Sequence, residues 1–210
     1  MQPLVATPQD FVFINCPFDK EYQKILNALI YCVYRCGFCP ITASIEDNAL
    51  DLRLNKIFEC INQSKYGIHD ISRIELNEEN YPRFNMPFEL GLFFGCRKFG
   101  DDQHKVKNAL IFEKKKYSYL HYISDLNGID TKSHGNNSFE AIRKVRTWLY
   151  SSSKRSLPGE EAIITDYKVF LSNLPGILKA LGVKRDNLSF NEYCEIVQTS
   201  ILEQLGTNKR

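Results

Sequence analysis

The stretch FVFINC at Phe11–Cys16 is a short apolar run in which polar and apolar residues do not alternate. A strand with this pattern is covered on both faces, as in a parallel sheet. Pro17 ends the run, and apolar residues then recur at helical spacing from Ile25 to Val33, ahead of Gly37, a typical helix stop. The stretch therefore predicts the first strand of a sheet whose strands alternate with helices.

The same alternation continues along the chain. Further strands, each separated from the next by apolar residues at helical spacing, are predicted at Phe38–Ile45, Tyr66–Ile71 and Val106–Phe112. This order predicts an α/β fold with a doubly wound, mainly parallel, flavodoxin-like sheet. A fifth strand is not clear, because residues 163–164 could supply a short one while Glu160–Leu171 reads equally well as helix.

Composition excludes several classes of protein. The chain has 210 residues, of which 43% are hydrophobic and 25% charged, as in ordinary globular proteins. A net charge of +2 gives no general attraction to nucleic acid or to a membrane, and no apolar run is long enough to span one. Residues 1–10 lack the pattern of a signal peptide. We therefore expect a cytoplasmic protein that binds neither nucleic acid nor membranes.

The cysteines predict buried thiols and no metal site. There are seven, an odd number, and most lie inside apolar segments, which is typical of reduced thiols in a cytosolic protein. The spacing of Cys32, Cys36 and Cys39 could suggest a metal site. Two of them lie on an apolar helix and no fourth ligand is near, so we expect no metal there.

A break in composition divides the chain. Residues 151–159 read as a linker rich in Ser, Pro and Gly, and the rest of the chain reads as helix, with Ser189 and Glu192 forming a capping box. We expect an α/β domain over residues 1–157 and a helical appendage over residues 158–210. The appendage is expected to pack on the sheet or to mediate contact with a second protomer or a partner protein.

The helix predicted after the third strand carries a candidate catalytic acid. Asn85 is placed to cap this helix and Pro87 to occupy its first turn. Glu89 would then lie in the first turn, where the helix dipole keeps a carboxylate ionised. Gly91 and Gly95 lie on one face and predict close backbone packing. The simpler interpretation is that Glu89 only stabilises the helix end.

The neighbouring strand ends favour a functional role for Glu89. In an open α/β sheet, ligands bind outside the carboxyl ends of the strands, at the point where the strand order reverses. Asp70 ends the third strand just before the helix of Glu89. The candidate substrate-binding residues that follow the predicted strands or open this helix are Asn15, Pro17, Phe18, Asp19, Glu46, His69, Ser72, Arg73, Asn85 and Met86.

Two of these segments resemble known families. FINCPF at Phe13–Phe18 resembles the first strand and following loop of nucleoside 2-deoxyribosyltransferases. FELG at Phe88–Gly91 resembles a helix start in that family, where the glutamate attacks the sugar C1′. Asp70 resembles the substrate-orienting acid of the same family. The order of elements is also similar to that of bacterial Toll/interleukin-1 receptor (TIR) domains, whose catalytic glutamate opens the helix after strand three. The similarity covers residues 11 to about 150.

The resemblance implies chemistry at an N-glycosidic bond. The transferases act on nucleosides and the TIR domains on NAD, so it implies NAD or another nucleotide as substrate, with no required cofactor. Bacterial proteins of this kind often act as effectors in antiphage defence. This chain departs from the transferases in the longer loop over residues 72–85 and in the helical tail. It departs from TIR domains in the apolar stretch Asn85–Phe88 before the glutamate.

The residues themselves fit this chemistry. A carboxylate beneath C1′ can stabilise an oxocarbenium-like cation or trap it covalently, which is the role expected of Glu89. A second acid, with Asp70 as the candidate, can protonate a poor leaving base, whereas nicotinamide leaves as a neutral molecule and needs no acid. Candidates to stack on the base are Phe18, Tyr81 and Phe84, and candidates to meet a phosphate are Arg53, Arg73 and Arg83. The alternative is a non-catalytic nucleotide-binding or assembly module of the same fold.

Overall fold

The computed structural model describes residues 10–43, 52–73, 84–113 and 115–207. One parallel sheet has the strand order β2-β1-β3-β4. Its strands are β1 (Phe11–Asn15), β2 (Cys39–Ile41), β3 (Tyr66–Asp70) and β4 (Asn108–Phe112). Asn15 pairs with His69 and Asp70 pairs with Phe112, so the last residues of these three strands reach the same edge of the sheet.

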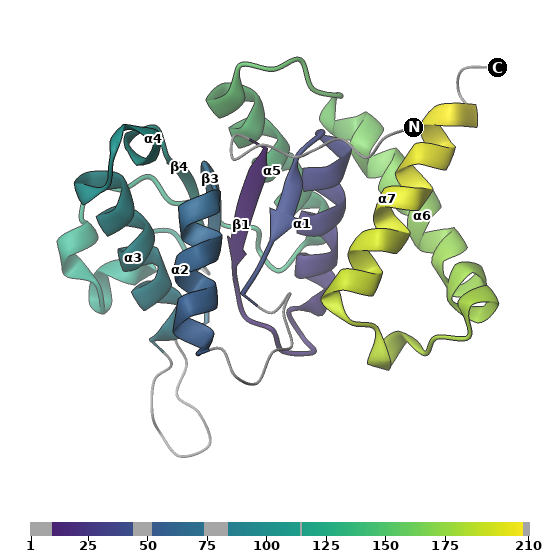
Figure 1. The fold of residues 1–210 in the computed structure, drawn as a ribbon, viewed down its shortest axis with the longest axis horizontal. Coiled ribbons are helices and arrows are strands. Elements are labelled where there is room, and N and C mark those ends of the chain that lie inside the picture. The colour runs from purple at the N-terminus through teal and green to yellow at the C-terminus, as the bar shows by residue number, and fades with distance from the viewer. Residues whose placement is uncertain (1–9, 44–51, 74–83, 114, 208–210) are drawn as a thin grey trace.

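Helices cover both faces of the sheet (Figure 1). One face carries α1 (Gln23–Arg35) and α5 (Ser138–Ser153), and the other carries α2 (Arg53–Gln63) and α3 (Asn85–Phe99). The remaining helices are α4 (Asp102–Lys105), α6 (Glu160–Leu181) and α7 (Phe190–Thr207), with short 3-10 turns η1 (Ser118–His121), η2 (Ser124–Leu126) and η3 (Arg185–Asn187). The predicted doubly wound α/β fold is thereby confirmed.

The strands are apolar because both faces are buried. Along β1, Val12 and Ile14 pack with α1 and α5, whereas Phe13 packs with α2 and α3. The second strand is shorter than predicted, and residues 44–45 of that prediction lie outside the described residues. Residues 163–164 belong to α6 and form no strand, because the apolar residues of this segment recur at helical rather than alternating spacing.

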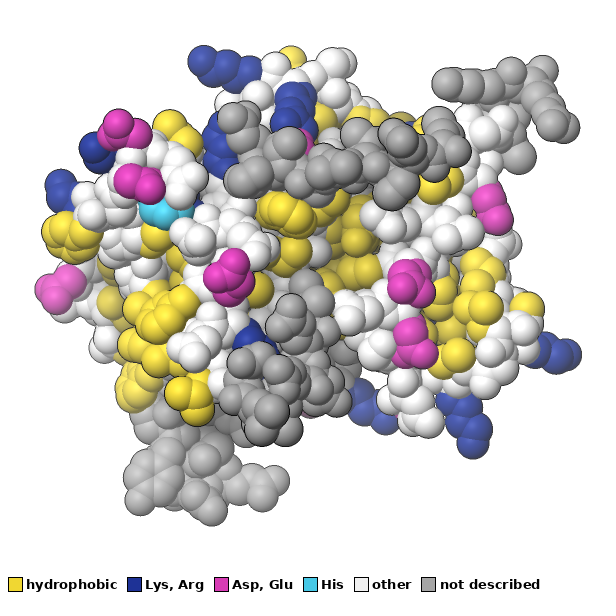
Figure 2. Space-filling model, in the orientation of Figure 1, with side chains coloured by type: hydrophobic (Ala, Val, Ile, Leu, Met, Phe, Trp, Pro, Cys, Tyr) yellow, Lys and Arg dark blue, Asp and Glu magenta, His cyan; other side chains and the backbone are white. Residues whose placement is uncertain are grey.

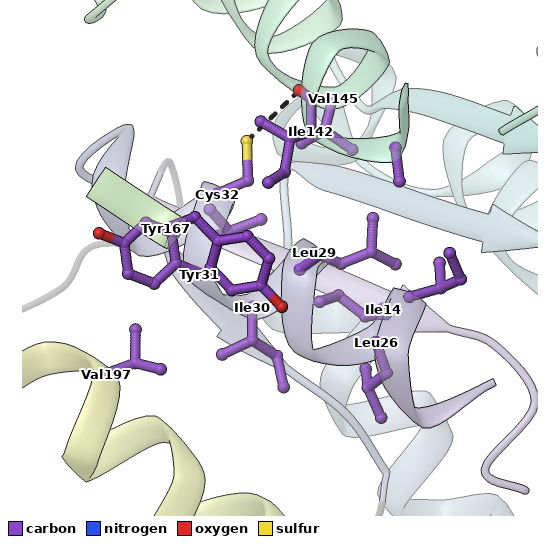
Figure 3. Close-up of a cluster of buried hydrophobic side chains, with 14 of the residues drawn as sticks. Ile14, Leu26, Leu29, Ile30, Tyr31, Cys32, Ile142, Val145, Tyr167 and Val197 are labelled. Atoms are coloured by element: carbon purple, nitrogen blue, oxygen red, sulfur yellow. Dashed lines mark hydrogen bonds between the residues drawn. The ribbon is translucent and has the colours of Figure 1, made fainter. Parts of the chain in front are cut away.

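The C-terminal helices extend the core on the α1 side of the sheet. Tyr31 on α1 contacts Tyr167 and Phe170 of α6, with ring centroids 4.9 Å and 5.2 Å away. Val197 of α7 belongs to the same buried cluster (Figure 3). The predicted capping box begins α7: the Ser189 Oγ accepts from the Glu192 amide at 3.2 Å, and the Glu192 carboxylate accepts from the Ser189 amide at 2.8 Å. These helices therefore share one continuous core with the sheet.

The helix of Glu89 differs from the prediction in two ways. Helix α3 already begins at Asn85, whose side chain does not cap it, so that Glu89 lies in the second turn. A Cβ added to Gly91 or Gly95 would meet no atom of the described residues within 4 Å, so the predicted close backbone packing is wrong. This face of α3 is open, and Figure 2 shows hydrophobic side chains gathered on the surface formed by α2 and α3.

None of the described helices combines the length and the apolar character needed to cross a membrane.

Candidate functional site

Asn15 connects the two strands at the point where the strand order reverses. Its side-chain Nδ2 donates to the main-chain oxygen of Met86 at 2.9 Å and lies 3.1 Å from the Nδ1 of His69. Because Met86 lies in the first turn of α3, this amide fixes the start of that helix against the end of β1. The buried Oδ1 of Asn15 has no hydrogen-bond partner in the described part of the chain. The contact places α3, and Glu89 with it, at the predicted edge of the sheet.

Glu89 is a buried carboxyl group. Only 4% of its surface is exposed. Burial raises its pKa to about 7, and the positive charge of Arg53 at the start of α2 offsets part of that rise. The expectation that the helix dipole keeps Glu89 fully ionised is therefore wrong, because desolvation outweighs a dipole that acts mainly on the first turn. At neutral pH this group is poised between its charged and neutral forms.

The polar residues that follow separate strands do converge. Cys16 lies directly after β1 and is fully buried. Burial raises the pKa of its thiol most, and the negative charges of Asp70, Glu89 and Asp19 raise it further. All three carboxyl groups therefore lie around the end of β1. The predicted meeting of the strand-end acids with the acid of α3 stays a prediction, supported by this shared influence on Cys16.

Asp70 is held as a carboxylate. Its Oδ2 accepts from the Tyr22 hydroxyl at 2.6 Å and lies 2.8 Å from the Nε2 of His134, and its Oδ1 accepts from the Ser72 amide at 2.8 Å. The pKa of this fully buried carboxyl is lowered because these hydrogen bonds, with that of His134 the largest, outweigh desolvation. This geometry argues against the expected role of Asp70 as a proton donor to a leaving base, because its proton is absent and its oxygens are engaged.

Two partners of Asp70 were not found by sequence reasoning. The Nδ1 of His134 accepts from the amide of Asn136 at 3.0 Å, so its Nε2 carries the hydrogen that is donated to Asp70. His134 lies 64 residues from Asp70 in sequence, in the long connection before α5, where no local pattern predicts the contact. Tyr22 lies just before α1 and is also buried.

A second buried carboxylate orders the connection that carries His134. Glu113 follows β4 directly and is fully buried. Its carboxylate accepts from the amides of Tyr117 and Tyr119, at 2.7 Å and 3.3 Å, and from the hydroxyl of Thr131. Glu113 therefore holds both halves of this connection against the end of β4. No sequence motif indicated this role.

The other candidate residues fall into two groups. Asp19 and Arg73 form an ion pair of 3.1 Å, and Arg73 also contacts Glu21 at 2.8 Å, so Arg73 is already engaged by carboxylates. The Asp19 Oδ1 accepts from the amide of Tyr22 at 2.9 Å and so caps the turn before α1. Ser72 contributes its amide to Asp70. These contacts assign a structural role to this group.

The second group lies at the surface of the same edge. Phe18 is 41% exposed and Phe84 is 53% exposed, so both rings remain candidates for stacking on a base. Pro17 is partly buried, and Asn85 is exposed at the start of α3.

His69 is fully buried, and burial lowers its pKa to about 3, so it is a neutral donor or acceptor and no general base at the surface. Glu46, Tyr81 and Arg83 lie outside the described residues.

We expect the Asp70→Asn variant to be less stable than the wild type by about 2–4 kcal/mol at pH 7, because an amide cannot accept from all three donors. The folded-state pKa of Asp70 is lowered, so the stabilisation by this carboxylate is present above an unfolded-state pKa of about 4 and is lost as pH falls below it. Urea unfolding at pH 7 and at pH 3.5 should show that the difference in free energy of unfolding between the wild type and the variant is smaller at pH 3.5. The exposed Asp125→Asn variant is the control; an equal loss at both pH values would contradict this account.

Within the described part of the chain, no group of three or more His, Cys, Asp or Glu side chains is arranged to hold a metal ion. Comparison with known proteins finds no matching family model, no matching curated protein and no matching solved structure. The function is therefore argued from the geometry of this site and from the resemblance of its segments.

Proposed function

We propose that this protein cleaves or transfers the N-glycosidic bond of a nucleotide, with Glu89 as the carboxylate beneath the sugar C1′. The observation that carries the proposal is the burial of Glu89 at the strand-order reversal, with a pKa raised to about 7. A structural acid at a helix start is normally exposed and has a lowered pKa. A carboxyl group kept buried at a ligand-binding edge is typical of a functional site.

The environment of Glu89 suits the stabilisation of a cation. Cleavage of the bond between C1′ and the base passes through an oxocarbenium-like state with positive charge on the sugar. A buried carboxylate is poorly solvated, so it gains more from this developing charge than a carboxylate in water would. Arg53 lies near enough to influence the pKa of Glu89 and is the candidate to meet a phosphate of the substrate. Phe18 and Phe84 are the candidates to stack on a base.

The state of Asp70 favours one class of leaving group. A neutral purine leaves C1′ poorly unless an acid protonates it, and Asp70 is held as a carboxylate. The cationic nicotinamide of NAD leaves as a neutral molecule without this help. We therefore infer that NAD, or a dinucleotide like it, is the preferred substrate, and that Asp70 positions the strand-end loops. A role in antiphage defence stays a prediction based on the resemblance.

The test is incubation of the purified protein with NAD, NADP, and a panel of nucleosides and nucleotides, followed by chromatography. Release of nicotinamide from NAD, with little cleavage of purine nucleosides, is the expected result. Removal of a general acid lowers the rate by roughly 100-fold or more. The Asp70→Asn variant should lose less than this in its rate of NAD cleavage. Binding of nucleotides without cleavage of any would instead support the non-catalytic nucleotide-binding module.

The rate of cleavage should depend on pH through Glu89. Its pKa is raised to about 7, and the proposed role needs the ionised form, so kcat/KM should rise from pH 5.5 to pH 7 and level off above pH 8. Nicotinamide release measured across this range, with stability checked at each pH, gives the profile. Activity that falls as pH rises through 7 would mean that the protonated form of Glu89 is the active one and would contradict this role.

A further inference from the structure

A groove of about 500 Å³ lies on the face of the sheet opposite Glu89. It is formed where the beginnings of α1 and α5 meet α6 and the η3 turn. The side chains that matter for its chemistry are those of Lys24 and Asn27 from α1, Phe139 from α5, Leu171 from α6, and Arg185 from η3. The proposed reaction does not use this groove.

The charge lining the groove is positive. Lys24 and Arg185 line it, and neither side chain forms an ion pair with any residue that the structure describes. No carboxylate is among the described residues that line the groove. Burial raises the pKa of Tyr167 to about 12 and also raises that of Tyr193, and the positive charge of Arg185 offsets part of both rises, so this guanidinium lies near those buried hydroxyls. Two unpaired cations facing one concave surface indicate an anionic ligand.

Asn27 provides a second and independent observation. Only 7% of its surface is exposed, and it lines the groove. Its Oδ1 accepts from the Nε2 of Gln23 at 2.8 Å, whereas its Nδ2 has no hydrogen-bond partner within the described ranges. The Nδ2 is not among the buried side-chain atoms that lack a partner, so it reaches solvent and is free to donate to a ligand. Asn27 lines the same groove as the two cations.

The start of α5 adds a weaker attraction. This helix has 16 residues, and the Asn137 Oδ1 already accepts from the amides of Phe139 and Glu140, at 2.8 Å and 3.2 Å. Those amides are satisfied, so an anion would be bound mainly by the side chains while the helix dipole favours its charge. Phe139 and Leu171 give the groove an apolar wall.

We propose that this groove binds the phosphate group of a small phosphorylated molecule, with Lys24, Arg185 and the Nδ2 of Asn27 as its partners. The organic part of that molecule lies against Phe139 and Leu171. Free phosphate carries the same kind of charge as a phosphate ester. The relative affinities of the two ligands show which of them the groove prefers. This proposal does not rest on the proposed reaction, because it involves neither Glu89 nor the opposite face of the sheet.

Calorimetric titration of the full chain with inorganic phosphate, AMP and adenosine tests the proposal. AMP should bind more tightly than inorganic phosphate, because it adds the apolar contact, and adenosine should not bind in the groove. The Arg185→Glu and Asn27→Asp variants should each weaken binding of inorganic phosphate by about tenfold or more. The matched control is Lys98→Glu, the same change of charge at an exposed position of α3 outside the groove, which should bind as the wild type does.

Several outcomes would overturn the site. The site would be refuted if inorganic phosphate did not bind, or if the wild type and both groove variants bound it equally. It would also be refuted if Lys98→Glu lost as much affinity for inorganic phosphate as the groove variants do. Equal affinity for AMP and inorganic phosphate would restrict the groove to free phosphate and overturn the role of the apolar wall. The Glu89→Gln variant should bind inorganic phosphate as the wild type does. Failure of the proposed reaction would therefore leave this result intact.

Discussion

The Glu89→Gln variant is expected to lose about 100-fold or more of the turnover of NAD, while it melts at a higher temperature than the wild type at pH 8. The amide keeps the shape of the side chain and removes the charge that stabilises the cation at C1′. The two effects have one cause, because the burial that makes this carboxylate effective also makes its ionisation costly to the fold.

The sign of the stability effect follows from the raised pKa. The folded protein holds the Glu89 proton up to about pH 7, whereas the unfolded chain releases it near pH 4.3. The contribution of Glu89 to the free energy of unfolding is therefore greatest in acid and falls as pH rises between these values. Glutamine does not ionise, so the variant does not lose stability in this way. Thermal unfolding at pH 5 and pH 8, with the exposed Glu195→Gln variant as control, measures it. Full turnover in Glu89→Gln would refute the proposed mechanism.

Truncation after Pro158 is expected to abolish cooperative folding. The C-terminal helices bury Ile163, Tyr167, Phe170 and Val197 almost completely in the cluster that contains Tyr31. Burial of a large apolar side chain contributes roughly 1.5–3 kcal/mol, and a domain of this size is stable by only about 5–15 kcal/mol in total. Loss of several such residues, with exposure of the outer face of α1, exceeds that margin.

Near-ultraviolet circular dichroism, dye binding and gel filtration of the shortened chain give the result. A chain that ends after Thr207 is the control, since it keeps all of α7. A cooperative melt of residues 1–158 would contradict this expectation and would establish that the predicted α/β domain folds without the C-terminal helices. Gel filtration of the full chain separately tests the predicted self-association through the C-terminal helices.

Local patterns were sufficient to predict the fold. The non-alternating run at Phe11–Cys16 is buried on both faces in β1, and Gly37 has the positive φ of 79° expected of a residue that follows a helix end. The capping box at Ser189 and Glu192 also depends only on neighbouring residues. Each of these signals acts within a few residues, which is the range that sequence reasoning covers well.

The details of the site depend on contacts between distant segments. The start of α3 is fixed by Asn15, 71 residues from Met86, and not by the side chain of Asn85. The pKa of Glu89 depends on how deeply tertiary packing buries it, which no helix-start pattern reports. The spacing of the α3 glycines predicts close packing, although a Cβ at Gly91 or Gly95 would meet no atom of the described residues within 4 Å. His134 had no local signal at all.

The network around Asp70 has a consequence for how this edge of the sheet opens. One carboxylate accepts from Tyr22 before α1, from Ser72 after β3, and from His134 before α5. None of these segments can separate without leaving a buried charge underpaired, so the three are expected to open together as one cooperative unit of local unfolding. Residues 135–137, which border the phosphate groove, adjoin His134 in that unit. A ligand that tightens this loop would slow opening at the end of β3, and this would couple the groove to the edge that carries Glu89.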